Sequence, residues 1–245
     1  YGNREHKDLN NSIAELYEAI NTTIAGHGNA LIPSFALERS QEILYYLREG
    51  VQKGALPKNL RVYLDSPMAI SATEIFRRHP EGFDEETWQV LMSGRDPFAL
   101  PGLHFTRDTA DSIALKNMDG VVIIAGSGMA TGGRIRHHLR NNLWIPEAAV
   151  IFVGFAAQGT LARTIIDGAE EVRIFQEEIA VNASIYTING FSAHADQREL
   201  LAWHGKTGAK RTFLVHGEES TMQTFAGLLA GTEMIMPEQH SMHTL

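Results

Sequence analysis

The chain has 245 residues, of which 44% are hydrophobic, and it carries a formal net charge of −8. This length suffices for one large core or two smaller ones, and the acidic balance excludes a protein that coats nucleic acid through bulk positive charge. Because the chain has no cysteine, disulfide scaffolds, thiolate zinc sites and cysteine nucleophiles are excluded, and any metal must be held by His, Asp or Glu.

The N-terminal part of the chain alternates helical and strand patterns. Apolar residues from Ile13 to Ile24 recur at helical spacing up to Gly26, ALIPSF is a short buried strand, and a second helix is expected from a Ser34 cap to Gly50. A strand followed by a turn or helix recurs in three later segments: RVYLDSPMA, GVVIIAGSG and AVIFVGFAAQGTLARTIIDG. This alternation predicts an α/β fold with a mostly parallel sheet.

The last third of the chain has a different pattern. EVRIFQEEIAV and ASIYTINGF predict consecutive strands, antiparallel if a hairpin at Asn182 joins them, and RTFLVHGE ends the series. The change predicts a second structural unit from about residue 149.

A glycine-rich turn lies within IIAGSGMATGGRIRHHL, residues 123–139. A buried strand runs into GSG (126–128), and TGG (131–133) begins a helix, which would gather unpaired backbone N–H groups around one point. Such a point binds phosphate well. The segment lacks the Lys-Ser/Thr ending of a P-loop and the spacing of a dinucleotide fingerprint, while Arg134 and Arg136 favour a polyanion. The alternative is a tight turn in which the glycines serve backbone conformation alone.

A histidine in the segment GFSAHAD, residues 190–196, is a second candidate. His194 lies between small residues just after a predicted strand, where neither bulk nor helical periodicity explains it. A loop histidine taken alone is more often structural or solvated than a metal ligand.

Seven segments in one order resemble the β-CASP ribonucleases of the metallo-β-lactamase superfamily, and they extend from residue 1 to about 218: YGNREH, IPSFALERSQEILYYL, VYLDSPMA, SGMATGGRIRHHL, VGFAAQGTLAR, GFSAHADQREL and LVHGE. The resemblance implies two zinc ions at the edge of a metallo-β-lactamase domain, an inserted β-CASP domain that forms a lid, and RNA in the cleft between them. It assigns 1–10 to the end of the first metallo-β-lactamase portion and 11–148 to a Rossmann-like, parallel-sheet β-CASP domain. Residues 149–245 would be the C-terminal part of the metallo-β-lactamase αββα fold.

The resemblance implies that His194 is a zinc ligand and a catalytic residue, and that SGMATGG clamps an RNA phosphate through its backbone. Hydroxyl and cationic donors near strand ends suit phosphate groups, although each of them, Ser34 above all, could equally serve as a helix cap or a solvated surface group. The residues expected to bind RNA or phosphate are Ser34, Arg39, Ser66, Ser127, Gly128, Met129, Thr131, Gly132 and Gly133.

Two departures from the family pattern limit what the chain is expected to do alone. The family's His-x-His-x-Asp-His motif is absent, and Thr164 stands where some members have a histidine near the scissile phosphate, so His216 is the candidate that acts on the leaving group. We therefore expect the C-terminal portion of a longer zinc-dependent ribonuclease, inactive by itself, whose partners are RNA and an upstream metallo-β-lactamase half.

Two alternative functions and the oligomeric state stay open at this point. A non-catalytic RNA-binding or assembly module and a Rossmann-like nucleotide-binding enzyme are the alternatives, and homodimers are common in the family. No apolar run approaches the roughly 20 residues of a membrane span, and the N-terminus has no signal pattern. Both observations predict a cytoplasmic protein that does not associate with membranes.

Overall fold

The computed structural model describes residues 2–243, which form two compact units. The larger unit contains residues 8–191, and the smaller unit contains residues 2–7 and 192–243. Tyr1, the first residue of the YGNREH segment, lies outside the described residues. No helix among residues 2–243 is long and apolar enough to cross a membrane.

The larger unit is built on one parallel sheet of six strands, in the order β3-β2-β4-β1-β5-β8. The strands are β1 (Ala30–Pro33), β2 (Val62–Leu64), β3 (Leu103–Phe105), β4 (Val122–Ala125), β5 (Ala149–Phe152) and β8 (Ser184–Thr187). The predicted α/β class with a parallel sheet is therefore confirmed.

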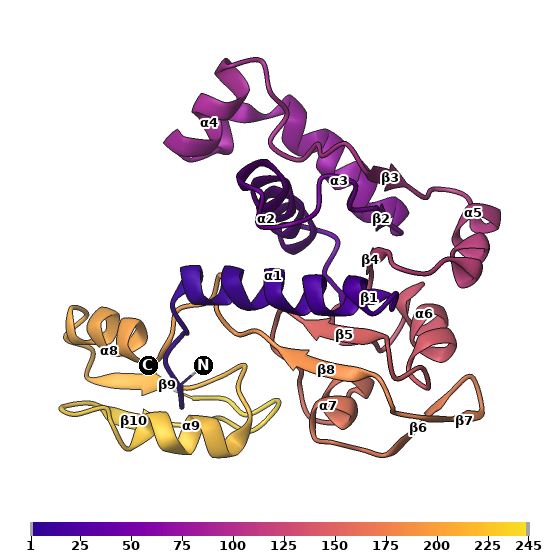
Figure 1. Ribbon diagram of the computed structural model, residues 1–245. Coiled ribbons are helices and arrows are strands. Elements are labelled where there is room, and N and C mark those ends of the chain that lie inside the picture. Colours follow the sequence, from indigo (N-terminus) through magenta and orange to yellow (C-terminus); the bar gives the residue numbers. More distant parts are fainter. Residues whose placement is uncertain (1, 244–245) are drawn as a thin grey trace. The chain divides into compact units, whose positions relative to one another are not determined.

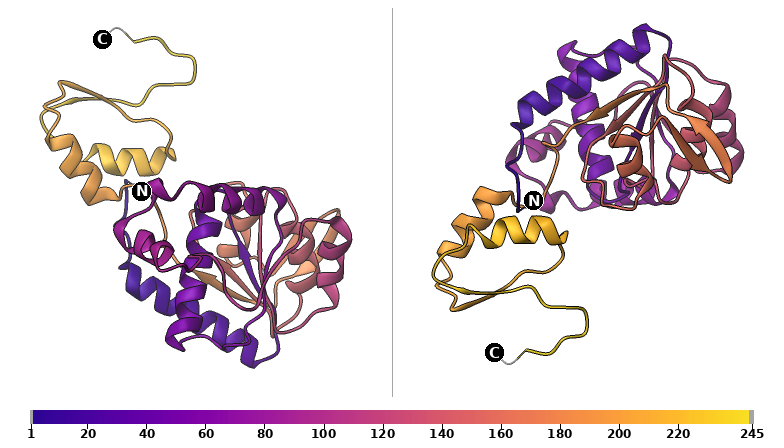
Figure 2. Two further views of the ribbon diagram at one scale, coloured as in Figure 1. Left: turned by 90° about the horizontal axis from the view of Figure 1, so that it is seen from above. Right: turned by 90° about the horizontal axis from the view of Figure 1, so that it is seen from below.

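Helices lie on both sides of this sheet (Figures 1 and 2). The core on one side includes residues of α1 (Leu9–Ala25), α2 (Arg39–Lys53) and α3 (Pro67–Arg78). The core on the other side includes residues of α6 (Ile135–Asn142) and α7 (Leu161–Ile166). The remaining helical segments of this unit are η1 (Pro80–Gly82), α4 (Glu85–Met92), α5 (Thr109–Ala114) and η2 (Leu115–Asn117).

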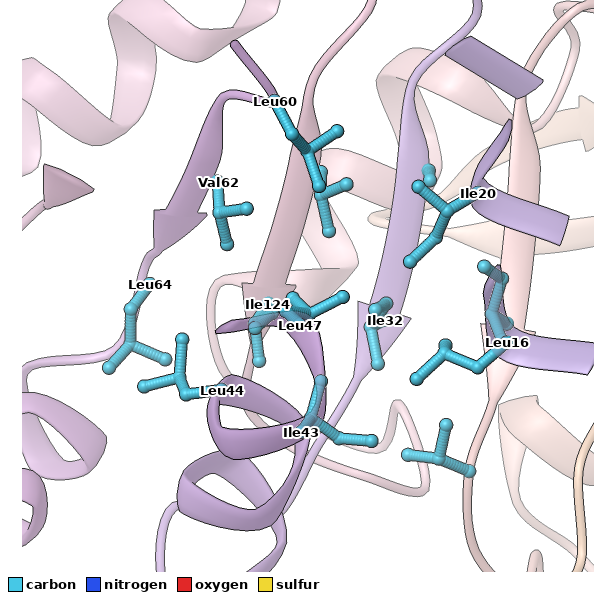
Figure 3. Close-up of a cluster of buried hydrophobic side chains, with 14 of the residues drawn as sticks. Leu16, Ile20, Ile32, Ile43, Leu44, Leu47, Leu60, Val62, Leu64 and Ile124 are labelled. Carbon is cyan, nitrogen blue, oxygen red and sulfur yellow. The ribbon is translucent and has the colours of Figure 1, made fainter. Parts of the chain in front are cut away.

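Two apolar cores result from the alternation of side chains along the buried strands. Ile32 and Ile124 pack toward α2 and belong to one core with its residues Ile43, Leu44 and Leu47 (Figure 3). Their neighbours Leu31, Ile123 and Val150 belong to the opposite core, which α6 and α7 complete. Because both faces of the central strands are covered, β1, β4 and β5 are continuously apolar, as expected for a parallel sheet.

The predicted limits of the second helix were wrong at both ends. Ser34 is buried and does not cap α2, which starts at Arg39 after Glu38 and continues to Lys53, where Gly54 adopts a left-handed conformation. Gly50 lies inside the helix instead of ending it. A Cβ atom at Gly50 would lie 2.8 Å from side-chain carbons of both Tyr17 and Leu56, so the glycine permits close packing.

The strand pattern of residues 171–187 also differs from the prediction. β6 (Glu171–Ile174) and β7 (Glu177–Ala180) form the antiparallel hairpin, which reverses at Phe175 and Gln176 and not at Asn182. β8 then pairs with β5 in parallel and extends the main sheet. The larger unit consequently continues through Phe191, past the change expected near residue 149. The assignment of 149–245 to one family portion stays a prediction.

The smaller unit contains a parallel pair of strands, β9 (Arg211–Phe213) and β10 (Glu233–Ile235). α9 (Glu219–Ala226) connects them in sequence, and α8 (Gln197–Gly205) precedes β9. Residues 2–7 join this unit through hydrogen bonds from Gln197, whose backbone N–H donates to the Arg4 carbonyl at 3.0 Å and whose amide donates to the Gly2 carbonyl at 2.7 Å.

Candidate nucleic-acid interface

The glycine loop, residues 126–134, follows β4 at the carboxyl edge of the sheet, between the segments that follow β1 and β2. A Cβ atom at Gly126 would lie 3.6 Å from the Ser34 carbonyl oxygen and 3.9 Å from Ser66 Oγ. The structure thus brings three of the predicted segments together, although they are separated in the sequence. Ligands of open α/β sheets bind at this edge.

Internal hydrogen bonds fold the glycine loop back on itself. Ser127 N–H donates to the Gly132 carbonyl at 3.1 Å, and Ile135 N–H donates to the Gly126 carbonyl at 3.0 Å. Ala130 and Gly133 have positive φ angles of 55° and 75°. The loop N–H groups that have no acceptor among residues 2–243 are those of Gly126, Gly128, Met129, Thr131, Gly133 and Arg134. Several unpaired backbone N–H groups within one loop favour an anion.

Two hydroxyl groups border these N–H donors. Ser127 Oγ lies 3.4 Å from Thr131 Oγ1 and accepts a hydrogen bond from Gly132 N–H at 3.3 Å. Thr131 is exposed. Both hydroxyls can donate to a phosphate oxygen that reaches the loop.

The loop glycines differ in what they allow. A Cβ atom at Gly133 would lie 2.2 Å from the Gly126 carbonyl oxygen, and one at Gly128 would lie 3.0 Å from two ring carbons of Phe35. At Gly132 a Cβ atom would meet nothing within 4 Å. Gly133 is therefore required by the fold of the loop, whereas Gly132 leaves its open side clear.

A buried carboxylate fixes the end of the loop, and sequence reasoning missed it. Asp65 Oδ1 accepts a hydrogen bond from Arg134 at 2.8 Å, while Oδ2 lies 2.6 Å from both His138 Nε2 and Ser112 Oγ. Arg134 also donates to the carbonyl oxygens of Thr106 at 2.9 Å and Arg107 at 2.8 Å. The only signal in the sequence was an aspartate directly after a strand.

The electrostatics of Asp65 follow from these contacts. Burial by itself would raise the pKa of Asp65, but hydrogen bonds from His138, Ser112 and Arg134 outweigh it and hold the pKa below its ordinary value. These bonds hold the Arg134 guanidinium in place. Any attraction of its charge for a polyanion therefore acts from a fixed position.

Three predicted phosphate donors have structural partners. Ser34 Oγ donates to the Phe35 carbonyl at 3.2 Å and accepts from Ser40 Oγ at 3.1 Å, and Ser66 Oγ accepts from Ala69 N–H and caps α3. The Arg39 guanidinium forms an ion pair with Glu42. Their role in phosphate binding stays a prediction.

In the smaller unit, His194 is exposed in the segment before α8. Its carbonyl oxygen lies 2.6 Å from His6 Nε2, and its N–H donates to Ser192 Oγ at 3.2 Å. Asp196 caps α8 and also accepts from His6 N–H. Backbone N–H groups of Glu199 and His6 lower the pKa of Asp196. His6 of the YGNREH segment is thus joined to His194 and Asp196 of the GFSAHAD segment within the smaller unit.

The second predicted histidine, His216, is exposed and follows β9 with a φ of 61°. Within residues 2–243, no group of three or more His, Asp and Glu side chains forms a potential metal site. Structural zinc takes four ligands, and catalytic zinc takes three from protein plus water. The described donors therefore do not fit a complete zinc site.

Comparisons with known proteins identify the family of this chain. Residues 40–165 match the Beta-Casp domain, and residues 178–237 match the Zn-dependent metallo-hydrolase RNA specificity domain, a family description that names zinc. Ribonuclease TTHA0252 of Thermus thermophilus is 42% identical over 231 residues, which cover 94% of this chain and 52% of that protein.

Archaeal proteins named transcription termination factor FttA are also similar. The protein of Methanocaldococcus jannaschii is 34% identical over 221 residues, 86% of this chain and 34% of that protein. The protein of Pyrococcus horikoshii is 35% identical over 214 residues, 83% of this chain and 32% of that protein. The chain thus spans between a third and about half of the length of these curated relatives.

Proposed function

The chain belongs to the β-CASP family of metallo-β-lactamase ribonucleases, and from this membership we propose that it binds RNA phosphates at the glycine loop and takes part in zinc-dependent RNA hydrolysis. The observation that carries the proposal is the set of loop N–H groups without an acceptor, at the sheet edge where Ser34, Ser66 and Ser127 meet. Backbone donors of this kind suit a phosphate oxygen.

The loop chemistry favours a polynucleotide backbone over a nucleotide cofactor. The loop has neither the Lys-Ser/Thr ending nor the glycine spacing by which nucleotide-binding turns hold their ligands. N–H groups that bind phosphate carry no information about base sequence. RNAs of different sequence should therefore bind this loop with similar strength.

The hydrolytic part of the proposal rests on two exposed imidazoles of the smaller unit. His194 is the first candidate for a zinc ligand, and His216 is the candidate for the group that protonates the leaving oxygen. Because the described residues do not complete a zinc shell, the remaining ligands would come from another part of the whole protein or from a partner chain. When bound, zinc would activate water and neutralise charge on the scissile phosphate.

Substitution of Gly132 tests the phosphate site. We expect Gly132→Val to fit without a clash inside the protein, because nothing lies within 4 Å of a Cβ atom there, and to crowd a phosphate bound at the N–H groups of the neighbouring Thr131 and Gly133. Loss of one charge-assisted hydrogen bond should weaken binding of oligo-A and oligo-U alike by about tenfold or more. Gly82→Val is the matched control, since its Cβ atom would also meet nothing. Unchanged RNA affinity in a folded Gly132→Val protein would refute the site.

Reciprocal histidine substitutions test the hydrolytic site in the whole protein. His194→Ala should lower zinc content and RNA cleavage, whereas His216→Ala should lower cleavage and leave zinc in place. If zinc is lost in His216→Ala and kept in His194→Ala, the two roles are exchanged. If both variants cleave RNA like the wild type, the hydrolytic proposal is wrong, and RNA binding without cleavage in the unsubstituted protein would support a non-catalytic module.

A further inference from the structure

An exposed aromatic ring lies directly against the glycine loop. Phe35 follows β1, and a Cβ atom at Gly128 would lie 3.0 Å from two of its ring carbons. The residue is nevertheless 48% exposed. The ring therefore borders Gly128, whose N–H group is one of the loop donors without an acceptor, and the residue still presents surface to solvent.

The backbone beneath this ring is held by buried serines. The Phe35 carbonyl oxygen accepts hydrogen bonds from Ser40 Oγ at 2.7 Å, Ser40 N–H at 3.3 Å and Ser34 Oγ at 3.2 Å. Ser34 and Ser40 are 1% and 2% exposed. Ser34 N–H also donates to the Ala125 carbonyl at 3.0 Å, which ties the segment to the end of β4. These bonds fix the backbone of Phe35 relative to the end of β4, where the glycine loop starts.

The adjoining donors indicate what would cover this ring. An exposed aromatic face offers a stacking surface to any nucleobase, since every base has a π face. A nucleotide carries a phosphate and a base on one sugar. In the protein, the loop donors that suit a phosphate and the ring that suits a base adjoin at Gly128. Proteins that hold single-stranded RNA combine these two features.

We propose that the ring of Phe35 stacks on a base of the RNA whose phosphate is bound by the glycine loop. The inference rests on the proposed RNA function and adds a base-contacting, positioning residue to it. Phe35 fixes the rotation of the nucleotide about its phosphate, and the contact is tolerant of sequence because it involves no hydrogen bond to a base edge. Purines, which have the larger face, stack more strongly than pyrimidines.

The test compares RNAs that have bases with RNAs that lack them. In the whole protein, Phe35→Ala should weaken oligo-A binding by about tenfold or more, while binding of an abasic RNA with the same number of phosphates should hardly change. Phe35→Trp should bind oligo-A at least as well as the wild type, and oligo-A should quench the indole fluorescence. Leu37→Ala, an exposed apolar residue of the same segment at 60% exposure, is the matched control and should bind as the wild type does.

Each other outcome overturns the stacking contact. Equal losses for oligo-A and abasic RNA would mean that the Phe35→Ala protein has a damaged loop, and equal losses in Phe35→Ala and Leu37→Ala would mean that the segment is a general apolar surface. If Gly132→Val weakens RNA binding and Phe35→Ala does not, the stacking contact fails while the phosphate site stands. If Gly132→Val has no effect, the proposed function itself fails.

Discussion

Replacement of Asp65 by alanine should destabilise the larger unit strongly. The carboxylate is fully buried and accepts from Arg134, His138 and Ser112, so its removal leaves three donors without their acceptor. Breaking a buried ion pair by removal of one partner costs about 3–5 kcal/mol. Arg134 is 21% exposed and keeps two carbonyl acceptors, which lowers the expected cost. We expect a loss of roughly 3 kcal/mol in the free energy of unfolding.

Urea unfolding followed by circular dichroism at pH 7 measures this loss, and thermal unfolding should show a fall of about 6–12 °C in Tm for a unit of this size. The pKa of Asp65 is lowered in the folded protein. Its stabilisation is therefore complete above the unfolded-state pKa, about 3.9, and is lost as the pH falls through the lower folded-state value. The difference between wild type and Asp65→Ala should shrink over that range.

Asp108→Ala is the control for this prediction. Asp108 is exposed before α5 and makes no side-chain capping bond, so its replacement should change stability by less than about 0.5 kcal/mol. A loss in Asp65→Ala no larger than that of the control, or a difference from wild type that persists unchanged to the lowest pH, would refute the reasoning about the buried carboxylate.

Three further predictions concern other parts of the chain. Gly133→Ala should cost more stability than Gly168→Ala in urea unfolding, because both have positive φ angles but only at Gly133 would a Cβ atom strike a backbone oxygen, at 2.2 Å; equal costs would count against the clash. The pKa of His137 is lowered mainly by burial and then by nearby cations, and its ring stacks on Phe175 with ring centroids 4.5 Å apart. Phe175→Ala should raise the pKa of His137 toward its ordinary value in an NMR titration. An unchanged pKa would contradict the role of burial. Metal analysis of the isolated 245-residue chain should find no stoichiometric zinc, and tightly bound zinc would show that its donors do assemble.

Local patterns predicted the buried strands β1, β2, β4 and β5 and the position of the glycine loop, because buried parallel strands and glycine-rich turns have strong sequence signals, whereas the short strands β3 and β10 were not predicted. The expected Ser34 cap failed because the serine hydroxyl is used in the buried contact with Ser40 and Phe35. Gly50 was predicted to end the helix because the sequence does not distinguish a glycine that ends a helix from one that allows close packing, here against Tyr17.

The contacts around the loop could not be predicted for a different reason. The partners of Asp65 are separated from it by 47, 69 and 73 positions. No local pattern reports such pairs. The donors of the loop were expected from its glycines, but which N–H groups stay unpaired depends on its internal hydrogen bonds.

The strand order has a consequence for how this protein acquires its site. β1 and β2 do not pair with each other, because β4 lies between them and pairs with both. During synthesis, β1 and β2 therefore share no strand partner until β4 has been made and has inserted into the central position, although the helices α2 and α3 that follow them also contact each other directly through Gln41. Insertion closes long chain loops, which is a late and slow event in folding. Phosphate binding should then appear together with the completed sheet, so that a chain able to hold RNA at this loop is one whose larger unit has already folded.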